Sequence, residues 1–169
     1  MQLTNVVVQA HLNCNLNLRE LVGVLTNVRY DPVKFSGLIW QHRRIGGNCL
    51  LFANGKINCN GKCSSIQEGI RRLRRYARLL QRKGCPVRLS NVRVLTVSAS
   101  HRFDDRVTLD CIPFDFKYDP ELFPAIMFKR QGIHFTLHFS GTLLITGIKG
   151  HKDIEYVVYP TILELSMCL

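Results

Sequence analysis

Short runs in which apolar and polar residues alternate follow one another along the chain and predict β-strands. Residues 3–12 (LTNVVVQAHL) and 91–100 (NVRVLTVSAS) are typical of long strands. Further extended runs end in Gly-containing hairpins at residues 54–55 and 140–141. The pattern therefore predicts antiparallel strands joined by tight turns.

Two longer segments have a helical pattern. Ser65 and Glu68 fit a capping box, and the apolar residues that follow recur at helical spacing until Gly84 stops the helix. Residues 151–166 are less regular and contain Pro160, which predicts a break or a kink there.

An internal repeat groups these elements into two similar halves. The hexapeptide YDPVKF at residues 30–35 returns as YDPELF at residues 118–123. After each copy come an extended run, a polar turn, a second extended run, a Gly hairpin and a closing strand. With short helices possible at residues 16–28 and 105–114, each half reads as strand, helix, four strands and helix.

The repeat predicts an α+β fold with helices on one face of a sheet. Five strands per half must bury one apolar face under helices, and the other face then stays open. No Gly-, Pro- or Ser-rich linker separates the halves. We therefore expect two repeats, residues 1–88 and 89–169, in one fused unit whose two sheets join edge to edge about a pseudo-twofold axis.

The balance of charge indicates a polyanionic partner. The 169 residues include 23 Lys and Arg against 12 Asp and Glu, which gives a net charge of +11. Such a surplus favours nucleic acid or an anionic membrane surface. The apolar runs are too short for a membrane span, and the start of the chain lacks the basic region of a secretory signal. No membrane partner is expected.

The chemically reactive residues form no recognisable metal or catalytic motif. Seven scattered cysteines without a secretion signal favour reduced thiols in an intracellular protein. Cys59 and Cys63 are the closest pair, and without a second matching pair buried thiols are favoured over a zinc site. A Gly-rich phosphate loop, paired acids at helical spacing and an oriented Cys-His pair are all missing from the sequence. We expect no enzymatic activity and no cofactor.

The hexapeptides and their neighbours resemble the TATA-box-binding protein family over nearly the whole chain. Both copies match the family's signature of Tyr, an acid or Asn, Pro, two residues and Phe. Residues 50–62 (LLFANGKINCNGK) are similar to its strand and Gly hairpin, and residues 74–84 (RRYARLLQRKG) look like its basic helix. The resemblance implies the family's saddle, a curved ten-stranded antiparallel sheet with four helices on its convex face.

The resemblance also implies a general transcription initiation factor. Such a factor binds and kinks A·T-rich promoter DNA through the minor groove and nucleates preinitiation complex assembly. The minor groove offers few hydrogen-bonding distinctions, so recognition depends on DNA shape and on apolar wedges between base steps, a mode for which this family is itself the reference example. The implied partners are promoter DNA, the general initiation factors A and B and the RNA polymerase machinery. The implied location is the nucleus, or the viral transcription compartment for a viral source.

The implied wedges are aromatic side chains, one pair for each hexapeptide. The first pair is Phe35 and Phe52, and the second begins with Phe123. Phe is usually buried, but both hexapeptide copies place it after a Pro-containing turn, which favours exposure. The second half is shorter in its polar turn, so the repeat register puts His138 at the position of Phe52 and sends Phe139 to the core. The competing register uses Phe139 as the fourth wedge.

The His138 register has a consequence for binding. A protonated imidazole is attracted to the negative minor groove, and histidine side chains gain a proton between about pH 8 and about pH 6. DNA binding is then expected to tighten over this interval, whereas a Phe139 wedge predicts little dependence on pH.

The remaining DNA-facing positions follow from the resemblance. Asn5 matches the family's central Asn, and Thr96 stands where a second central Asn is expected. Asn58 and Asn60 replace a more apolar pair, which makes the expected groove face more polar. The other groove-facing candidates are Val7, Leu50, Leu144 and Thr146, and the candidates for phosphate contacts are Arg43, Lys56, Lys129 and Lys149.

Two protein-docking surfaces are also implied. The basic helix matches the family's contact for factor A, although a row of charges on a helix is often only a solvated face. Its candidate residues are Arg71, Arg72, Arg74, Arg75, Arg78 and Arg82. In the second hexapeptide, Asp119, Glu121 and Leu122 stand at the family's contact for factor B.

Two other interpretations stay open. A divergent paralogue would keep the docking surfaces and act mainly through protein partners, with weak or non-TATA DNA binding. The polar open face could instead take stacked RNA bases, but it lacks the aromatic residues in mid-strand that RNA-binding sheets use.

Overall fold

A computed structural model describes residues 1–168, with the backbone alone at position 111. The strands are β1 (Gln2–His11), β2 (Val28–Arg29), β3 (Leu38–Trp40), β4 (Asn48–Leu51), β5 (Lys56–Asn60), β6 (Ser90–Arg102), β7 (Lys117–Asp119), β8 (Phe123–Arg130), β9 (Ile133–His138) and β10 (Thr142–Ile148). They form a ten-stranded sheet in the order β2-β3-β4-β5-β1-β6-β10-β9-β8-β7, with antiparallel pairing in both halves of this order. The predicted ten-stranded antiparallel α+β fold is confirmed.

The helices are fewer than the four expected. They are α1 (Leu18–Val24), α2 (Ile66–Arg82) and a C-terminal helix made of α3 (His151–Asp153), the π-helical η2 (Ile154–Val158) and α4 (Tyr159–Ser166). Residues 105–114 form only the single 3-10 turn η1 (Leu109–Cys111). Pro113 disfavours a helical conformation for the residue before it, and Ile112 is extended, with φ −81° and ψ 116°. The short helix that the sequence allowed at residues 105–114 is therefore reduced to one turn.

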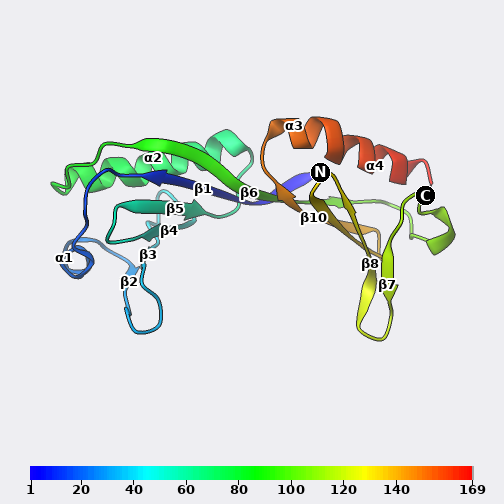
Figure 1. Ribbon diagram of the computed structural model, residues 1–169, viewed down its shortest axis with the longest axis horizontal. Coiled ribbons are helices and arrows are strands. Elements are labelled where there is room, and N and C mark those ends of the chain that lie inside the picture. Colours follow the sequence, from blue (N-terminus) through cyan, green and yellow to red (C-terminus); the bar gives the residue numbers. More distant parts are fainter. Residues whose placement is uncertain (169) are drawn as a thin grey trace. The chain divides into compact units, whose positions relative to one another are not determined.

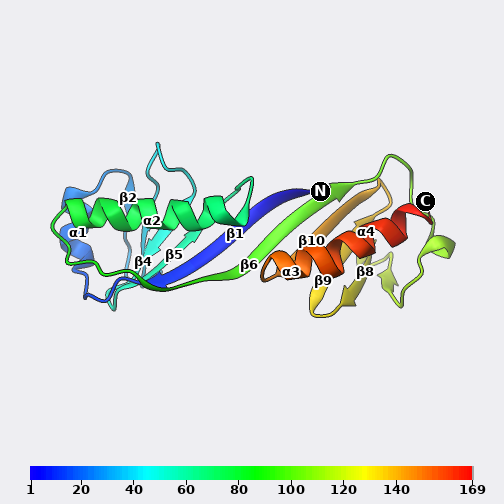
Figure 2. The ribbon, with the colours of Figure 1, turned by 90° about the horizontal axis from the view of Figure 1, so that it is seen from above.

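The chain divides into two compact units. The N-terminal unit is Asn5–Leu95, and the C-terminal unit runs from Thr96 onward and includes Met1–Thr4. Each contains, in order, a short helical segment, hairpin strands and a long helix. Figure 1 shows the long helix of each unit on one side of that unit's strands, and Figure 2 shows α2 running over β4 and β5. The opposite side of the strands is the open face of each unit.

The core of the N-terminal unit lies between its strands and α2. Val6 and Val8 of β1 are fully buried. Gly69 lets α2 approach β1, because an added Cβ at this position would lie only 2.7 Å from Val6 Cγ1. Trp40 packs edge to face on Tyr76, with ring centroids 4.9 Å apart, and burial raises the pKa of Tyr76 to about 12. This contact packs α2 against β3.

The start of α2 follows the predicted capping pattern with one change. Ser65 Oγ accepts a hydrogen bond from Glu68 N at 3.1 Å. The Glu68 carboxylate accepts from Ser64, from its hydroxyl and from its backbone N–H, each at 2.6 Å. These bonds lower the pKa of Glu68. The helix therefore begins where the sequence predicts, with Ser64 as the second capping residue.

The core of the C-terminal unit is built on stacked phenylalanines. Phe128 and Phe135 face each other across β8 and β9, with ring centroids 5.0 Å apart and an interplanar angle of 4°. Arg130 Nη1 donates to Thr161 Oγ1 and to Glu164 Oε2, both at 3.1 Å. These bonds attach α4 to β8.

Pro160 does not break the C-terminal helix. Proline lacks a backbone N–H and crowds the preceding turn of a helix. Here the turn before Pro160 widens into the π-helical segment, in which Tyr159 N donates to Ile154 O. A π-bulge is one of the recognised causes of a kink in a helix. The irregularity predicted at Pro160 therefore takes the form of this π-helical turn, and the helix continues to Ser166.

Candidate nucleic-acid interface

The two hexapeptides form similar turns, the first directly after β2 and the second from the end of β7 to the start of β8. Asp31 Oδ1 accepts a hydrogen bond from Val33 N, and Asp119 Oδ1 accepts one from Glu121 N, each at 3.2 Å. This Asx turn gives both Asp-Pro pairs a local structural role. In Figure 1 each hexapeptide loop extends from its own unit on the side away from that unit's long helix.

Each loop ends in an exposed Phe that packs on a second ring. Phe35 is 40% exposed and Phe123 is 41% exposed. Phe35 meets Phe52 edge to face, with centroids 5.8 Å apart and an interplanar angle of 73°. Phe123 meets His138 in nearly the same geometry, 6.0 Å and 68°. The two loops therefore present matching ring pairs of different composition.

The hairpin turns explain why His138 stands in the place of Phe52. Gly55 N donates to Phe52 O at 2.9 Å, and Gly141 N donates to His138 O at 2.9 Å. Gly55 and Gly141 have φ of +85° and +84°, a conformation that glycine adopts without strain. Phe52 and His138 thus occupy the same position of the same turn, which agrees with the repeat register in the sequence.

Phe139 has a different environment. It is half-buried and packs edge to face on Tyr118 of β7, with ring centroids 5.4 Å apart. Along β9, His134, Thr136 and His138 alternate with three fully buried residues, Ile133, Phe135 and Leu137. The alternation places His138, rather than Phe139, on the same side of β9 as Thr136.

The open face of the N-terminal unit carries the other predicted groove residues. On β1 the half-buried Asn5 and Val7 alternate with buried neighbours, as Leu50 does on β4 and Asn58 and Asn60 do on β5. Asn5 Oδ1 accepts from Gly61 N at 2.9 Å, which ties its side chain to the end of β5. The open face of the N-terminal unit therefore carries more polar side chains than the groove residues predicted from the sequence.

Two chains of side-chain hydrogen bonds cross this face. In the first, Arg93 donates to Gln9 Oε1, and Gln9 Nε2 donates to Asn58 Oδ1 at 2.9 Å. In the second, Gln41 Nε2 donates to Asn48 Oδ1, and Asn48 Nδ2 donates to Asn60 Oδ1 at 3.2 Å. The partners of Asn58 and Asn60 were not among the residues predicted from the sequence. The alternation along β1 that places Asn5 and Val7 on the open face also places Gln9 there, so Gln9 could have been predicted from the sequence.

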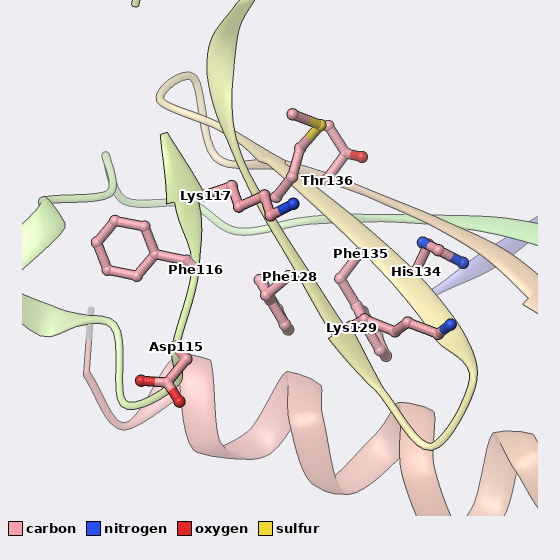
Figure 3. A pocket seen from close by; sticks show the side chains of 9 residues that line it. Asp115, Phe116, Lys117, Phe128, Lys129, His134, Phe135 and Thr136 are labelled. Atoms are coloured by element: carbon pink, nitrogen blue, oxygen red, sulfur yellow. The ribbon is translucent and has the colours of Figure 1, made fainter. Parts of the chain in front are cut away.

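The open face of the C-terminal unit is less amide-rich. Thr96 is half-buried, whereas Leu144 and Thr146 on β10 are exposed and alternate with buried neighbours. Lys129 lies opposite His134 on the neighbouring strand. Both residues line a pocket of about 720 Å³ at the β7 edge, shown in Figure 3, where Lys117 adds a further cation and Asp115 a carboxylate.

The cations proposed for phosphate contacts lie in separate places. Arg43 is exposed in the turn between β3 and β4, and Lys56 is half-buried at the start of β5. Lys149 is exposed, and its backbone N–H donates to Asp153 Oδ2 at 2.7 Å, at the start of α3. Lys129 therefore stands beside the pocket, and the other three stand at loop or strand ends.

The outer side of α2 is strongly basic. Its exposed cations are Arg71, Arg74, Arg75, Arg78 and Arg82. Between α2 and the β3–β4 turn lies a groove of about 460 Å³, to which the turn contributes His42, Arg44 and Ile45 and the helix contributes Arg75, Arg78, Leu79 and Arg82. The proximity of this turn to α2 could not be predicted from the sequence, because only tertiary packing brings the two together.

Arg72 is a correction to the predicted partner set. It is only 9% exposed, its Nη2 donates to Lys62 O at 2.8 Å, and Glu68 Oε1 lies 4.0 Å away. Its guanidinium packs beside Gly47 and Gly61, where an added Cβ would lie 2.9 Å and 2.8 Å from Nη1. A buried arginine that closes the connection from β5 to α2 cannot face a partner. The acids of the second hexapeptide, by contrast, are exposed, as is Leu122.

Three cysteines of the N-terminal unit are buried, whereas Cys14 and Cys85 are half-buried. Cys49 and Cys59 lie opposite each other on β4 and β5, and burial raises the pKa of the Cys49 thiol well above its usual range. Cys63 is also buried. Among residues 1–168 no three His, Cys, Asp or Glu side chains come together as metal ligands would. In the same part of the chain, no helix has the length and apolar character of a membrane span.

Comparison with known proteins identifies the family. The sequence profile described as "Transcription factor TFIID (or TATA-binding protein, TBP)" matches residues 1–83. TATA box-binding protein-like 2 of Mus musculus is 32% identical over 160 residues, which cover 90% of this chain and 45% of that protein. TBP-related factor of Drosophila melanogaster is 30% identical over 160 residues, which cover 91% of this chain and 71% of that protein. The chain belongs to the TATA-binding protein family.

The TATA-binding protein family consists of transcription factors rather than enzymes. The chain spans about half the length of TATA box-binding protein-like 2 from Mus musculus and from Rattus norvegicus. Its fold matches the solved structure of Methanococcus jannaschii TBP with a TM-score of 0.81 and 24% identity, and the match covers 98% of both chains. The sequence resemblance to the TATA-binding protein family is thus confirmed.

Proposed function

We propose that this chain is a transcription initiation factor of the nucleus that binds A·T-rich promoter DNA through the minor groove, kinks it and nucleates assembly of the preinitiation complex. The observation that carries the proposal is the pair of loops with the same Asx turn, each with an exposed Phe packed edge to face on a second ring. An exposed ring at the end of a rigid loop can be driven between base steps, and a partly unstacked step bends the duplex.

The charge of the chain supports the proposal. A net charge of +11 favours association with the phosphate backbone whatever the sequence of the DNA. Lys56, Lys129, Lys149 and Arg43 are the proposed phosphate contacts, and Asn5, Val7, Leu50, Leu144, Thr146 and Thr96 are the proposed groove contacts. Contacts to phosphates position the protein, whereas the ring pairs and the groove residues distinguish sequences.

The proposed protein partners bind two further surfaces. The exposed arginines of α2, with the adjoining groove, suit an acidic surface such as that of factor A, because opposite charges steer association and fix orientation. Asp119, Glu121 and Leu122 at the tip of the second hexapeptide loop are the proposed contact for factor B.

The direct test is an assay of binding and bending on short duplexes. Affinity for A·T-rich and G·C-rich duplexes would be measured at several salt concentrations, and bending would be followed by fluorescence transfer between the duplex ends. We expect tighter binding and greater end-to-end approach on A·T-rich DNA at every salt concentration. Equal affinity for both duplexes with no bending would contradict the proposal.

A second candidate function rests on the polar open face of the N-terminal unit. A paralogue that acts mainly through protein partners has less need of an apolar groove-binding face, and the Asn58 and Asn60 amides make this face polar. For this candidate, an acidic partner would bind through α2 at salt concentrations at which the chain alone does not bind any duplex.

A further inference from the structure

Asn58 lies at the end of a hydrogen-bond chain whose direction is fixed. Arg93 Nη2 and Nε donate to Gln9 Oε1 at 2.7 and 3.2 Å, and Gln9 Nε2 donates to Asn58 Oδ1 at 2.9 Å. A guanidinium can only donate. Gln9 must therefore turn its oxygen toward Arg93 and its nitrogen toward Asn58, and Asn58 must turn its oxygen toward Gln9.

The fixed direction of these hydrogen bonds leaves the Asn58 amide nitrogen available to a ligand. Gln9 and Asn58 lie directly opposite each other on β1 and β5, and Leu50 lies opposite Asn58 on the other side. Leu50 has no polar side-chain atom that could divert the amide. Within residues 1–168 no hydrogen bond uses Asn58 Nδ2. The arginine therefore sets Asn58 to present N–H donors, and not its oxygen, on the open face.

We propose that Asn58 is a specificity-determining residue whose N–H groups select a base pair without a minor-groove amine. This inference rests on the proposed function. An A·T pair shows only acceptors in the minor groove, adenine N3 and thymine O2, whereas a G·C pair adds the N2 amino donor of guanine. An amine opposite Asn58 would place donor against donor and leave both unpaired, so guanine is excluded at this pair.

The second hydrogen-bond chain on the same face has no arginine to fix its direction. It starts at the exposed amide of Gln41 and ends at Asn60. Because an amide can either donate or accept, the whole chain can reverse and leave Asn60 with its oxygen outward. Asn60 is therefore expected to tolerate a groove amine that Asn58 rejects.

Modified bases test the proposal, because they add or remove the minor-groove amine while each base keeps its pairing partner. Replacing adenine by 2,6-diaminopurine adds the groove amine to an A·T pair, and replacing guanine by inosine removes it from a G·C pair. For the parent protein we expect a loss of affinity of roughly tenfold when diaminopurine occupies one particular pair. At the same pair, inosine·C should bind better than G·C by a similar factor. Equal affinity for diaminopurine and adenine at every pair would overturn the inference.

Reversing the direction of the hydrogen bond between residue 9 and Asn58 provides the sharper test. In Gln9→Glu the carboxylate can only accept, so Asn58 must turn its nitrogen toward residue 9 and present its oxygen to the groove. The preference at that pair should then change sign, with diaminopurine·T bound more tightly than A·T. The ratio between two duplexes cancels the general weakening that an added negative charge causes. The matched control is Gln9→Glu combined with Asn58→Leu, which carries the same charge and should show no such preference.

A second variant keeps the test open if Gln9→Glu does not fold. Arg93→Met removes the fixed donor from an exposed strand position, so the Gln9 and Asn58 amides can turn either way and the tenfold penalty should fall to about twofold or less. A penalty unchanged in both Gln9→Glu and Arg93→Met would overturn the inference and leave the proposed function intact. If the parent binds none of the duplexes, the proposed function fails and this inference fails with it.

Discussion

The N-terminal and C-terminal units have the same order of strands but very different exposed surfaces. The first presents a Phe–Phe ring pair, amide chains on its open face and an arginine-rich helix. The second presents a Phe–His pair and a long helix on which Tyr156, Tyr159 and Leu163 are exposed. The buried alternating positions, which determine topology, are alike, and the exposed positions have diverged.

This difference indicates where function lies in the fold. A shared topology needs only buried residues at every second strand position and small residues at the turns. Exposed residues carry no such constraint, so their divergence separates the tasks of the two units. The long helices show this best, because α2 is basic and amphipathic whereas α4 exposes apolar side chains and few charges.

The largest expected effect is on partner binding, which should depend on α2 and not on the long helix of the C-terminal unit. Replacing Arg71, Arg74 and Arg78 by Glu should weaken binding of an acidic partner such as factor A by about 100-fold or more, because like charges brought together cost several kcal/mol. The intrinsic DNA bend should not change. Partner binding would be measured by calorimetry and bending by fluorescence transfer.

The matched control lies on the other long helix. Replacing Tyr156, Tyr159 and Leu163 by Ser should leave factor A binding unchanged, because these side chains belong to the C-terminal unit. If the bend disappeared together with partner binding in the arginine variant, α2 would be contacting DNA and the assignment of the two surfaces would be wrong.

A smaller effect is expected in the core of the N-terminal unit. The Tyr76 hydroxyl donates to Gly46 O and accepts from His42 N, both at 3.0 Å. Tyr76→Phe leaves both backbone groups without this partner and should lower the free energy of unfolding by about 1–3 kcal/mol. The same substitution at Tyr156, which is 65% exposed, should change it by less than about 0.5 kcal/mol. Urea unfolding of both variants measures the difference, and equal effects would contradict this role.

The smallest effect concerns the ring that differs between the two loops. His138→Phe should increase bending, because a phenyl ring is a larger and more apolar wedge than an imidazole ring. His134 on the same strand is present in both proteins, so the comparison isolates His138. If parent and variant bend the duplex equally while Phe139→Ala loses its bend, Phe139 is the fourth wedge.

The strands and the repeat could be predicted because they depend on local alternation. The hexapeptides, the Gly hairpins and the start of α2 at Ser65 each leave a signature within a few residues. The register of β9 was also readable, because the spacing from hexapeptide to hairpin glycine distinguishes His138 from Phe139.

Other features depend on tertiary contacts and could not be predicted in this way. Arg72 looks like its exposed neighbours in sequence, and only the cavity beside Gly47 and Gly61 buries it. Arg93 and Gln9 meet across two strands that are far apart in the chain. The missing helix at residues 105–114 reflects the effect of Pro113 on a segment whose apolar pattern alone suggested a helix.

The central claim is that the ring pairs on the hexapeptide loops bend DNA, and replacing Phe35 and Phe123 by Ala tests it most directly. Fluorescence transfer between the ends of an A·T-rich duplex should show bending by the parent and a nearly straight duplex with the double variant. Affinity should fall by no more than about tenfold, because the phosphate contacts survive. Leu122→Ala, an exposed apolar change in the same loop, should keep the bend. A bend that is unchanged in the double variant would contradict the claim.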